Sequence, residues 1–213
     1  IMRKIQNSIL LLLLCTFSSY TQENDFQIWT SLSVNNKVIS KTDINIKHGL
    51  RFRENASLLS KSYSDIRLKY KYNKRISLGV GYRDINEWNK ELSREQKNRY
   101  YSDLYLRNKL DRFVLSVRNR YQKQGNTNSH TYLFRQKLSI SYNIRKNKLE
   151  PLLAAEYFYS EQKRINKLRY TLAFSYPISK DLDFDIYYRI QQQINIENPE
   201  TLFILSGKLA YDF

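Results

Sequence analysis

The sequence has few cysteines, prolines and glycines and no long apolar run. Its 213 residues include one cysteine, three prolines and five glycines. It has no run of ~20 uncharged apolar residues, which excludes a membrane protein built from spanning helices. Cys15 follows Leu14, whereas a lipidated cysteine follows a small residue, so we expect Cys15 to leave with an N-terminal leader. The rest of the chain then has neither disulfides nor thiolate chemistry.

The N-terminal segment has the pattern of a secretory signal peptide. Arg3 and Lys4 precede an apolar run at 9–14, and small residues stand at the first and third places before Gln22. We therefore expect residues 1–21 to be a cleaved signal peptide and residues 22–213 to be one exported domain.

The chain is strongly basic. It carries 36 Lys and Arg against 20 Asp and Glu, a formal net charge of +16. Such an excess suggests nucleic acid, anionic lipid head groups or acidic solutes as partners. Because the chain is exported, we exclude nucleic acid and expect lipopolysaccharide phosphates or small anionic solutes.

The last thirteen residues alternate between two kinds of side chain up to the final position. One face carries Phe203, Leu205, Gly207, Leu209, Tyr211 and Phe213, and the other carries Ser206, Lys208 and Asp212. A long alternating strand that ends on an aromatic residue is typical of the closing strand of a transmembrane β-barrel. Tyr211 and Phe213 are our candidate membrane-insertion signal. An ordinary edge strand is the alternative for this stretch alone.

The same alternation divides the rest of the chain into about eleven strands. Short connections at 73–75, 110–112, 145–148 and 177–181 alternate with longer polar stretches at 86–98, 124–129, 160–166 and 192–200. This asymmetry is that of an up-and-down outer-membrane barrel. The fold class is therefore an all-β transmembrane antiparallel barrel of ten to twelve strands.

The strand count conflicts with one rule. A barrel with both termini in the periplasm needs an even number of strands, and strands two to eleven alone would satisfy it. The strand near 26–34 is then surplus. Either it pairs outside this rule, or a twelfth strand lies in a stretch that reads as loop.

Alternation alone does not say which face meets lipid. A secreted soluble barrel or sandwich that binds a lipid or another small ligand has the same period. Strand lengths beyond the ~9–11 residues of a membrane crossing favour the membrane barrel. Tyrosines at the ends of the apolar faces also favour it, because interfacial girdles are rich in Tyr. These are Tyr72, Tyr82, Tyr121, Tyr132, Tyr142, Tyr159, Tyr176 and Tyr188.

Four stretches carry a resemblance to a known family. They are F-x-I-W-T at 26–30, LGVGYRD at 78–84, EPLLAAEYFY at 150–159 and GKLAYDF at 207–213. With the preceding signal, they resemble the uncharacterised outer-membrane family called domain of unknown function 2490. The resemblance spans essentially the whole mature chain and implies a membrane barrel. Its motifs are structural, and the family brings no established catalytic residues.

In such a barrel the polar face of each strand lines the lumen. The predicted lumen-lining residues are Arg51, Arg53, Arg67, Lys69, Arg83, Arg107, Arg118, Arg120, Arg135, Lys137, Glu156, Arg169, Asp183, Asp185 and Arg189. A wall of one charge sign concentrates counter-ions, which predicts a narrow anion-biased pore. The alternative is a closed structural barrel whose long charged side chains neutralise one another.

Catalysis has little support in the sequence. His48 falls on the lipid-facing phase and His130 lies beside a loop, and a catalytic Ser-His pair has no support in the sequence beyond chance. We therefore expect no catalytic, cofactor-binding or metal-ligating residues. An outer-membrane enzyme or an adhesin acting through loops such as 86–98 stays an alternative.

The expected location is the cell outer membrane. The expected partners are outer-membrane lipids including lipopolysaccharide, the barrel-assembly machinery and small anionic solutes.

Overall fold

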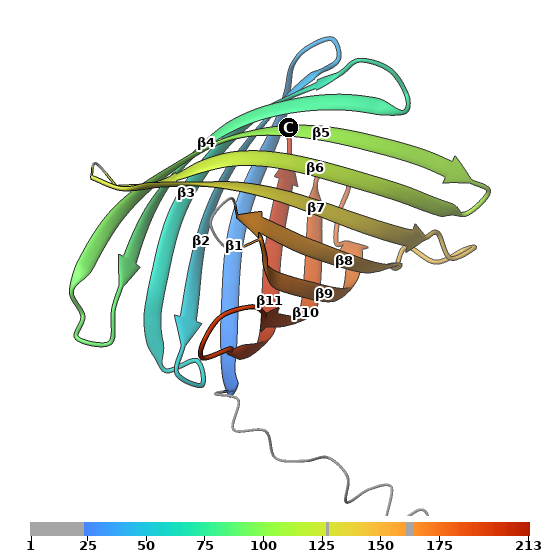
Figure 1. Cartoon of the computed structure of the whole chain (residues 1–213). Helices are drawn as coiled ribbons and strands as arrows, with labels where there is room; N and C mark the ends of the chain where they lie inside the picture. The colour runs from blue at the N-terminus through green and yellow to red at the C-terminus, as the bar shows by residue number, and fades with distance from the viewer. Residues whose placement is uncertain (1–23, 127, 161–163) are drawn as a thin grey trace, which may run out of the picture.

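The protein is a single β-barrel (Figure 1). The structure, a computed structural model, describes residues 24–126, 128–160 and 164–213. These residues form β1 (Asn24–Ile39), β2 (Thr42–Arg53), β3 (Leu58–Lys71), β4 (Ile76–Trp88), β5 (Arg94–Leu110), β6 (Phe113–Gly125), β7 (His130–Tyr142), β8 (Glu150–Ser160), β9 (Arg164–Pro177), β10 (Leu182–Gln193) and β11 (Thr201–Asp212). The predicted signal peptide at 1–21 lies outside the described residues. Within them, no helix is long and apolar enough to cross a membrane.

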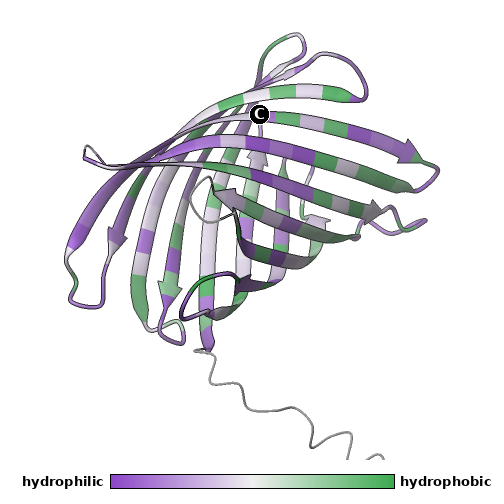
Figure 2. Ribbon diagram, in the orientation of Figure 1, coloured by the Kyte–Doolittle hydropathy of each residue, from purple (hydrophilic) through white to green (hydrophobic). Residues whose placement is uncertain are grey.

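The strands follow from the period-two pattern of the sequence. Apolar and polar residues alternate along most of the strands, and Figure 2 shows green and purple segments mixed along the ribbons. Strand lengths run from 11 residues in β8 to 17 in β5. Because successive side chains of a strand point to opposite faces, this pattern gives the closed sheet one apolar and one polar surface.

The barrel closes through β1, which pairs in parallel with β11. Asn24 lies opposite Thr201 and Asn35 lies opposite Asp212, so the seam is paired along most of β1. The expectation of an even strand number, with antiparallel pairing throughout, was therefore wrong. The first of the two sequence alternatives is confirmed: β1 pairs outside the up-and-down rule. The parallel seam leaves no unpaired edge between the two terminal strands.

The odd strand number places the described chain ends at opposite mouths of the barrel. We call these mouths the Asn24 end and the Phe213 end. The Phe213 end carries the turns at 40–41, 72–75, 111–112, 143–149 and 178–181. The Asn24 end includes the connections at 54–57, 89–93 and 194–200.

The prediction of a long loop at 86–98 was wrong. The antiparallel pairing of β4 with β5 continues to Trp88 and Arg94, which leaves only residues 89–93 as the turn. Cross-strand contacts stabilise this polar hairpin: Lys97 Nζ lies 2.6 Å from Glu87 Oε2, and Arg94 Nε donates to Asn86 Oδ1 at 2.9 Å. Both faces are polar here, so composition indicates a loop although the backbone is paired. Similarly, β9 begins at Arg164, inside the predicted loop at 160–166.

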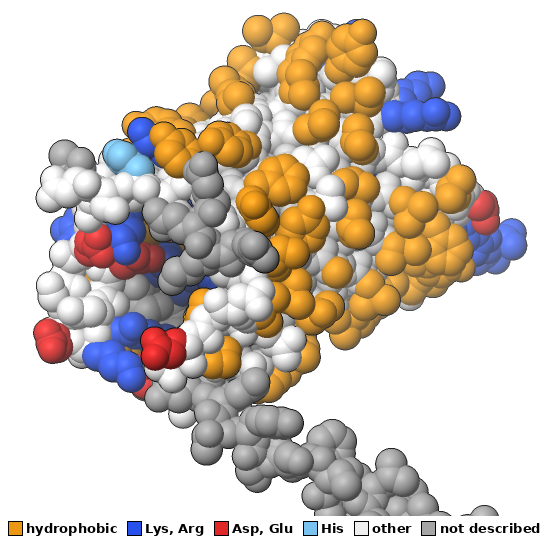
Figure 3. Space-filling view, in the orientation of Figure 1, with side chains coloured by type: hydrophobic (Ala, Val, Ile, Leu, Met, Phe, Trp, Pro, Cys, Tyr) orange, Lys and Arg blue, Asp and Glu red, His pale blue; other side chains and the backbone are white. Residues whose placement is uncertain are grey.

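The barrel is apolar outside and polar inside, the reverse of a soluble barrel. Outward residues such as Leu32, Val80 and Leu153 are 62%, 57% and 58% exposed. Among described residues, the largest fully buried apolar side chains are Ile85 and Ile204, and most other buried side chains are polar or charged. Figure 3 shows hydrophobic side chains spread over the visible outer wall, with charged side chains gathered at its ends. An apolar outer wall around a polar interior is the arrangement of a barrel surrounded by lipid.

Aromatic side chains gather at two levels of the outer wall. Toward the Asn24 end, Tyr82 packs on Tyr100 with ring centroids 5.0 Å apart, and Tyr121 on Tyr132 at 6.1 Å. Toward the Phe213 end, Phe113 packs on Tyr142 at 4.8 Å, and Tyr211 on Phe213 at 4.7 Å. The step along β6 from Phe113 to Tyr121 is roughly 26 Å of extended chain, which strand tilt shortens to a band of roughly 20 Å. The two levels resemble the aromatic girdles of a membrane barrel.

Two glycines let tyrosine rings lie against the inner wall. An ideal Cβ on Gly49 would stand 2.5 Å from Tyr63 Cζ, and a Cβ on Gly81 would collide with the Tyr101 ring. Any other residue at these positions would push the ring into the lumen. The two glycines therefore let the tyrosine rings lie flat on the wall, which leaves the lumen beside them free.

Candidate functional site in the barrel lumen

The lumen holds a large polar cavity of about 1280 Å³. It is lined by 17 Lys or Arg and four Asp or Glu side chains, so its wall carries a large excess of positive charge. Since one water occupies roughly 30 Å³ in the liquid, the cavity has room for tens of water molecules. Eight-stranded barrels are filled by their own side chains, whereas the wider wall of this barrel leaves space inside.

A second cavity of about 330 Å³ lies at the Phe213 end, with Phe213 in its lining. Asn35, Asn45 and Arg67 line both cavities. The larger cavity reaches Trp88 and Arg94 near the opposite mouth. The two cavities therefore adjoin at the three shared residues, and their linings together extend along most of the barrel.

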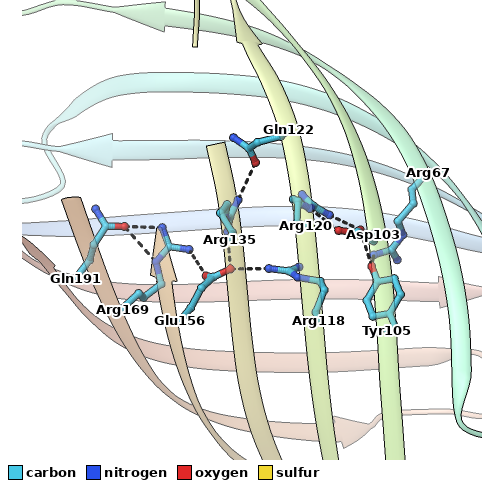
Figure 4. A network of polar contacts seen from close by, with 10 residues as sticks. All are labelled: Arg67, Asp103, Tyr105, Arg118, Arg120, Gln122, Arg135, Glu156, Arg169 and Gln191. Atoms are coloured by element: carbon cyan, nitrogen blue, oxygen red, sulfur yellow. Dashed lines mark hydrogen bonds and ion pairs between the residues drawn. The ribbon is translucent and has the colours of Figure 1, made fainter. Parts of the chain in front are cut away.

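Asp103 anchors one ion pair in the wall between β5 and β6. The Arg120 guanidinium donates to both Asp103 carboxylate oxygens at 2.7 Å, a two-point contact, and the Tyr105 hydroxyl donates to Asp103 Oδ2 at 2.8 Å. Arg67 Nη1 donates to the Tyr105 hydroxyl at 3.2 Å (Figure 4). Planar two-point contacts of this kind are among the stronger charged hydrogen bonds in proteins.

Glu156 is shared by three guanidinium groups. Arg118 Nη2 and Arg135 Nη2 lie 2.7 and 2.9 Å from Glu156 Oε1, and Arg169 Nη1 lies 3.3 Å from Oε2. Arg169 Nε also donates to Gln191 Oε1 at 3.1 Å, so the chain of contacts crosses from β6 to β10 (Figure 4). One carboxylate thus holds three cations, and this part of the wall keeps a net positive charge.

Two further carboxylates, Asp65 and Asp185, each form an ion pair with one cation. Arg83 Nε lies 2.8 Å from Asp65 Oδ2, and the Tyr101 hydroxyl donates to Asp65 Oδ1 at 2.9 Å. Lys208 Nζ lies 2.8 Å from Asp185 Oδ2. Glu87 pairs with Lys61 and Lys97, and Glu95 with Lys97, so every carboxylate that lines the large cavity is paired and a surplus of cations is left.

Nine lining cations form no ion pair with any described carboxylate. They are Lys47, Arg51, Arg53, Arg67, Arg94, Arg99, Lys137, Lys167 and Arg189. Neutral groups hold some of them, for example Gln124, which accepts from Arg99 Nε at 2.8 Å. Fixed positive charge without a matching carboxylate attracts mobile anions.

The predicted lumen-lining residues fall into three groups. The larger cavity is lined by Arg51, Arg53, Arg67, Arg83, Arg118, Arg120, Arg135, Lys137, Glu156, Arg169 and Arg189. Lys69 lines the smaller cavity. Arg107, Asp183 and Asp185 line neither: Arg107 is exposed near the Phe213 end, and Asp185 is buried in the wall against Lys208.

Seven cations outside the predicted set also line the large cavity. They are Lys47, Lys61, Arg94, Lys97, Arg99, Lys167 and Lys208. Lys208 lies on the polar face that the sequence assigns to the last strand. Lys97 and Arg94 belong to the hairpin that reads as a loop. Continuing the alternation of β5 back from Asp103 through Tyr101 to Arg99 and Lys97 would have found two of them.

One contact bears on catalysis. His48 Nδ1 lies 3.1 Å from Ser64 Oγ, a pair that the sequence did not indicate. Both residues are exposed on the outer face. In the described part of the chain no carboxylate is hydrogen-bonded to His48. Asp84 lies opposite Ser64 in the sheet register, but its carboxylate accepts a hydrogen bond from Gln96. The described residues also contain no group of three His, Cys, Asp or Glu that could hold a metal ion.

Comparison with known proteins adds a family. No curated protein matches the sequence. A solved structure, the β domain of the Bordetella autotransporter BrkA, superposes with a TM-score of 0.44 at 10% identity, over 78% of this chain and 82% of that chain. The sequence profile of a family described as protein of unknown function (DUF2490) matches residues 26–201. With most of the barrel inside this match, the chain belongs to the DUF2490 family.

Proposed function

We propose that the protein is an integral outer-membrane barrel whose lumen passes small anions. The observation that carries this proposal is the pair of adjoining polar cavities, the larger of which is lined by 17 cationic and four anionic side chains. The exposed apolar wall and the two aromatic levels support insertion in a bilayer. The exported character that the sequence suggests supports the outer membrane as the location.

The charge of the wall sets the direction of selectivity. Surplus cations such as Arg51, Arg53 and Arg189 face a confined volume of water, and low-dielectric walls focus their field along the lumen. Anions are concentrated inside and cations are excluded. We expect the boundary between the two cavities, at Asn35, Asn45 and Arg67, to limit the size of the permeant ion.

A closed barrel is the second candidate, and the ion-pair networks favour it. Glu156 with its three arginines and Asp103 with Arg120 tie strands one or two apart together along the lumen wall. If these networks extended across the lumen they would block it. The contacts of Arg120 and Arg135 join neighbouring strands of the wall, and the 1280 Å³ cavity remains beside them.

Membrane insertion is tested first. The folded barrel should stay in the membrane pellet after extraction with alkaline carbonate and should shift its gel mobility on heating. Release by carbonate would indicate the soluble lipid-binding barrel instead.

Conduction is then measured in a planar bilayer under a salt gradient. We expect discrete conductance steps and a reversal potential of anionic sign. Arg53→Gln should reduce the anion preference, because Arg53 is a lining cation that makes no ion pair with a described carboxylate. Arg75→Gln, in an exposed turn outside both cavities, is the matched control. A folded, heat-shifting protein without steps would refute the channel and favour the closed barrel.

A further inference from the structure

Three arginines surround one indole inside the lumen. The Arg51 guanidinium carbon lies 3.7 Å from the centroid of the Trp29 ring, and those of Arg169 and Arg189 lie 5.5 and 5.6 Å from it. All four residues line the large cavity. The three positive charges repel one another at this range.

The barrel closure brings these residues together. Trp29 on β1 lies opposite Arg51 on β2 and opposite Ser206 on β11 in the sheet register. Ser206 accepts a hydrogen bond from Arg189 Nη1, so β10 reaches the same place. The positions are set by paired strands, which are rigid elements for holding a binding site.

The cluster has far more positive than negative charge. Arg169 shares Glu156 with Arg118 and Arg135, so these residues together with Arg51 and Arg189 place five guanidinium groups against one carboxylate. Neither Arg51 nor Arg189 forms an ion pair with a carboxylate of the described residues. Arg51 Nε is buried and, within the described chain, has no hydrogen-bond partner.

Stacking on Trp29 does not supply hydrogen-bond acceptors for the N–H groups of Arg51. A guanidinium on an aromatic ring gains from the cation–π interaction through its face, but its N–H donors lie along its edge. Arg51 is stacked in this way and also lies 5.5 Å from the Tyr63 ring. The rings thus fix the orientation of Arg51, which lines the cavity and has no ion-pair partner among the described carboxylates.

We propose that this cluster, Trp29 with Arg51, Arg169 and Arg189, binds a compact oxyanion that carries two or more negative charges, of the phosphate and polyphosphate class. Guanidinium groups match tetrahedral oxyanions with two-point hydrogen bonds, which a halide does not offer. A multivalent anion also offsets the mutual repulsion of several cations at once. The inference rests on the proposed function in one respect: the anion must enter the lumen from water.

Trp29 itself reports binding. The chain has two tryptophans, so Trp88→Phe leaves Trp29 as the sole emitter. The detergent-folded Trp88→Phe protein is titrated with inorganic pyrophosphate, and separately with sodium chloride at equal ionic strength. We expect a saturable change of emission with pyrophosphate and a weaker, unsaturated change with chloride. Identical responses to the two salts would overturn the site.

Variants in the same background locate the binding. Arg189→Gln leaves the Arg51 stack on Trp29 intact and should weaken pyrophosphate binding by at least about tenfold, since a hydrogen bond to a charged group contributes about 1.5–3 kcal/mol. Arg107→Gln makes the same charge change outside both cavities and should leave affinity unchanged. Equal affinities in the two variants would place the anion elsewhere. If Arg189→Gln lost its heat-dependent gel shift, Arg189→Lys would carry the comparison, with an intermediate affinity expected.

Conductance separates this site from the channel. With chloride as the current carrier, pyrophosphate should reduce the current over the concentration range that saturates Trp29. Anion-selective steps without pyrophosphate binding would refute the site and leave the channel standing. Saturable binding without any steps would support the site and refute the channel.

Discussion

Replacing Glu156 with glutamine should destabilise the folded barrel by about 3–5 kcal/mol, the range for breaking one side of a buried ion pair. The Glu156 side chain is 4% exposed and lies 2.7, 2.9 and 3.3 Å from nitrogens of Arg118, Arg135 and Arg169. At such separations and an effective dielectric constant of about 20, each pair attracts by roughly 5–6 kcal/mol. The desolvation of four charged groups offsets much of that sum. Glutamine keeps the shape, but three cations then repel one another without a counter-charge.

The assay is equilibrium unfolding by urea in lipid vesicles, followed by the gel shift and by tryptophan emission. Glu150→Gln is the control, because Glu150 lies on the same strand but is exposed and should change stability by less than about 0.5 kcal/mol. A loss below about 1 kcal/mol for Glu156→Gln would refute the reasoning, since it would mean that water already screens the three arginines.

Two further substitutions test the wall itself. Gly49→Ala should cost about 1–3 kcal/mol by overpacking, because its Cβ would lie 2.5 Å from Tyr63 Cζ, whereas Gly207→Ala, with Phe184 Cε2 at 3.8 Å, should be tolerated; similar unfolding midpoints for the two would contradict the packing argument. Val80→Arg, at a position 57% exposed in the apolar band, should cost about 2–4 kcal/mol in lipid, and Glu91→Arg in the exposed turn at 89–93 should not; a neutral Val80→Arg would argue against a lipid-facing wall.

The alternation of the sequence was sufficient to predict the strands and their faces. Period two is a local property, so residues such as Leu78, Val80 and Tyr82 could be assigned to one face from their spacing alone. The error at 86–98 has the same origin. Where a hairpin rises beyond the lipid, both of its faces are polar, and composition no longer distinguishes strand from loop.

The partners inside the lumen could not be predicted in this way. Glu156 meets Arg118 two strands away, 38 positions apart in the sequence, and this contact depends on the register of β6, β7 and β8. A shift of two residues in one pairing would keep every side chain on its face and yet change each ion pair. The sequence therefore predicted a basic lumen without predicting which cations stay unpaired.

The parallel seam connects the fold to the proposed site. A ten-stranded barrel formed by β2 to β11 alone would satisfy the alternation and would join β2 directly to β11. Trp29 would then be absent from the wall, and Arg51 would lose the ring that orients it 3.7 Å away. With β1 inserted, Trp29 stands between Arg51 and Ser206, and Ser206 holds Arg189. The strand that breaks the even-number rule thus supplies the residue around which the surplus cations gather.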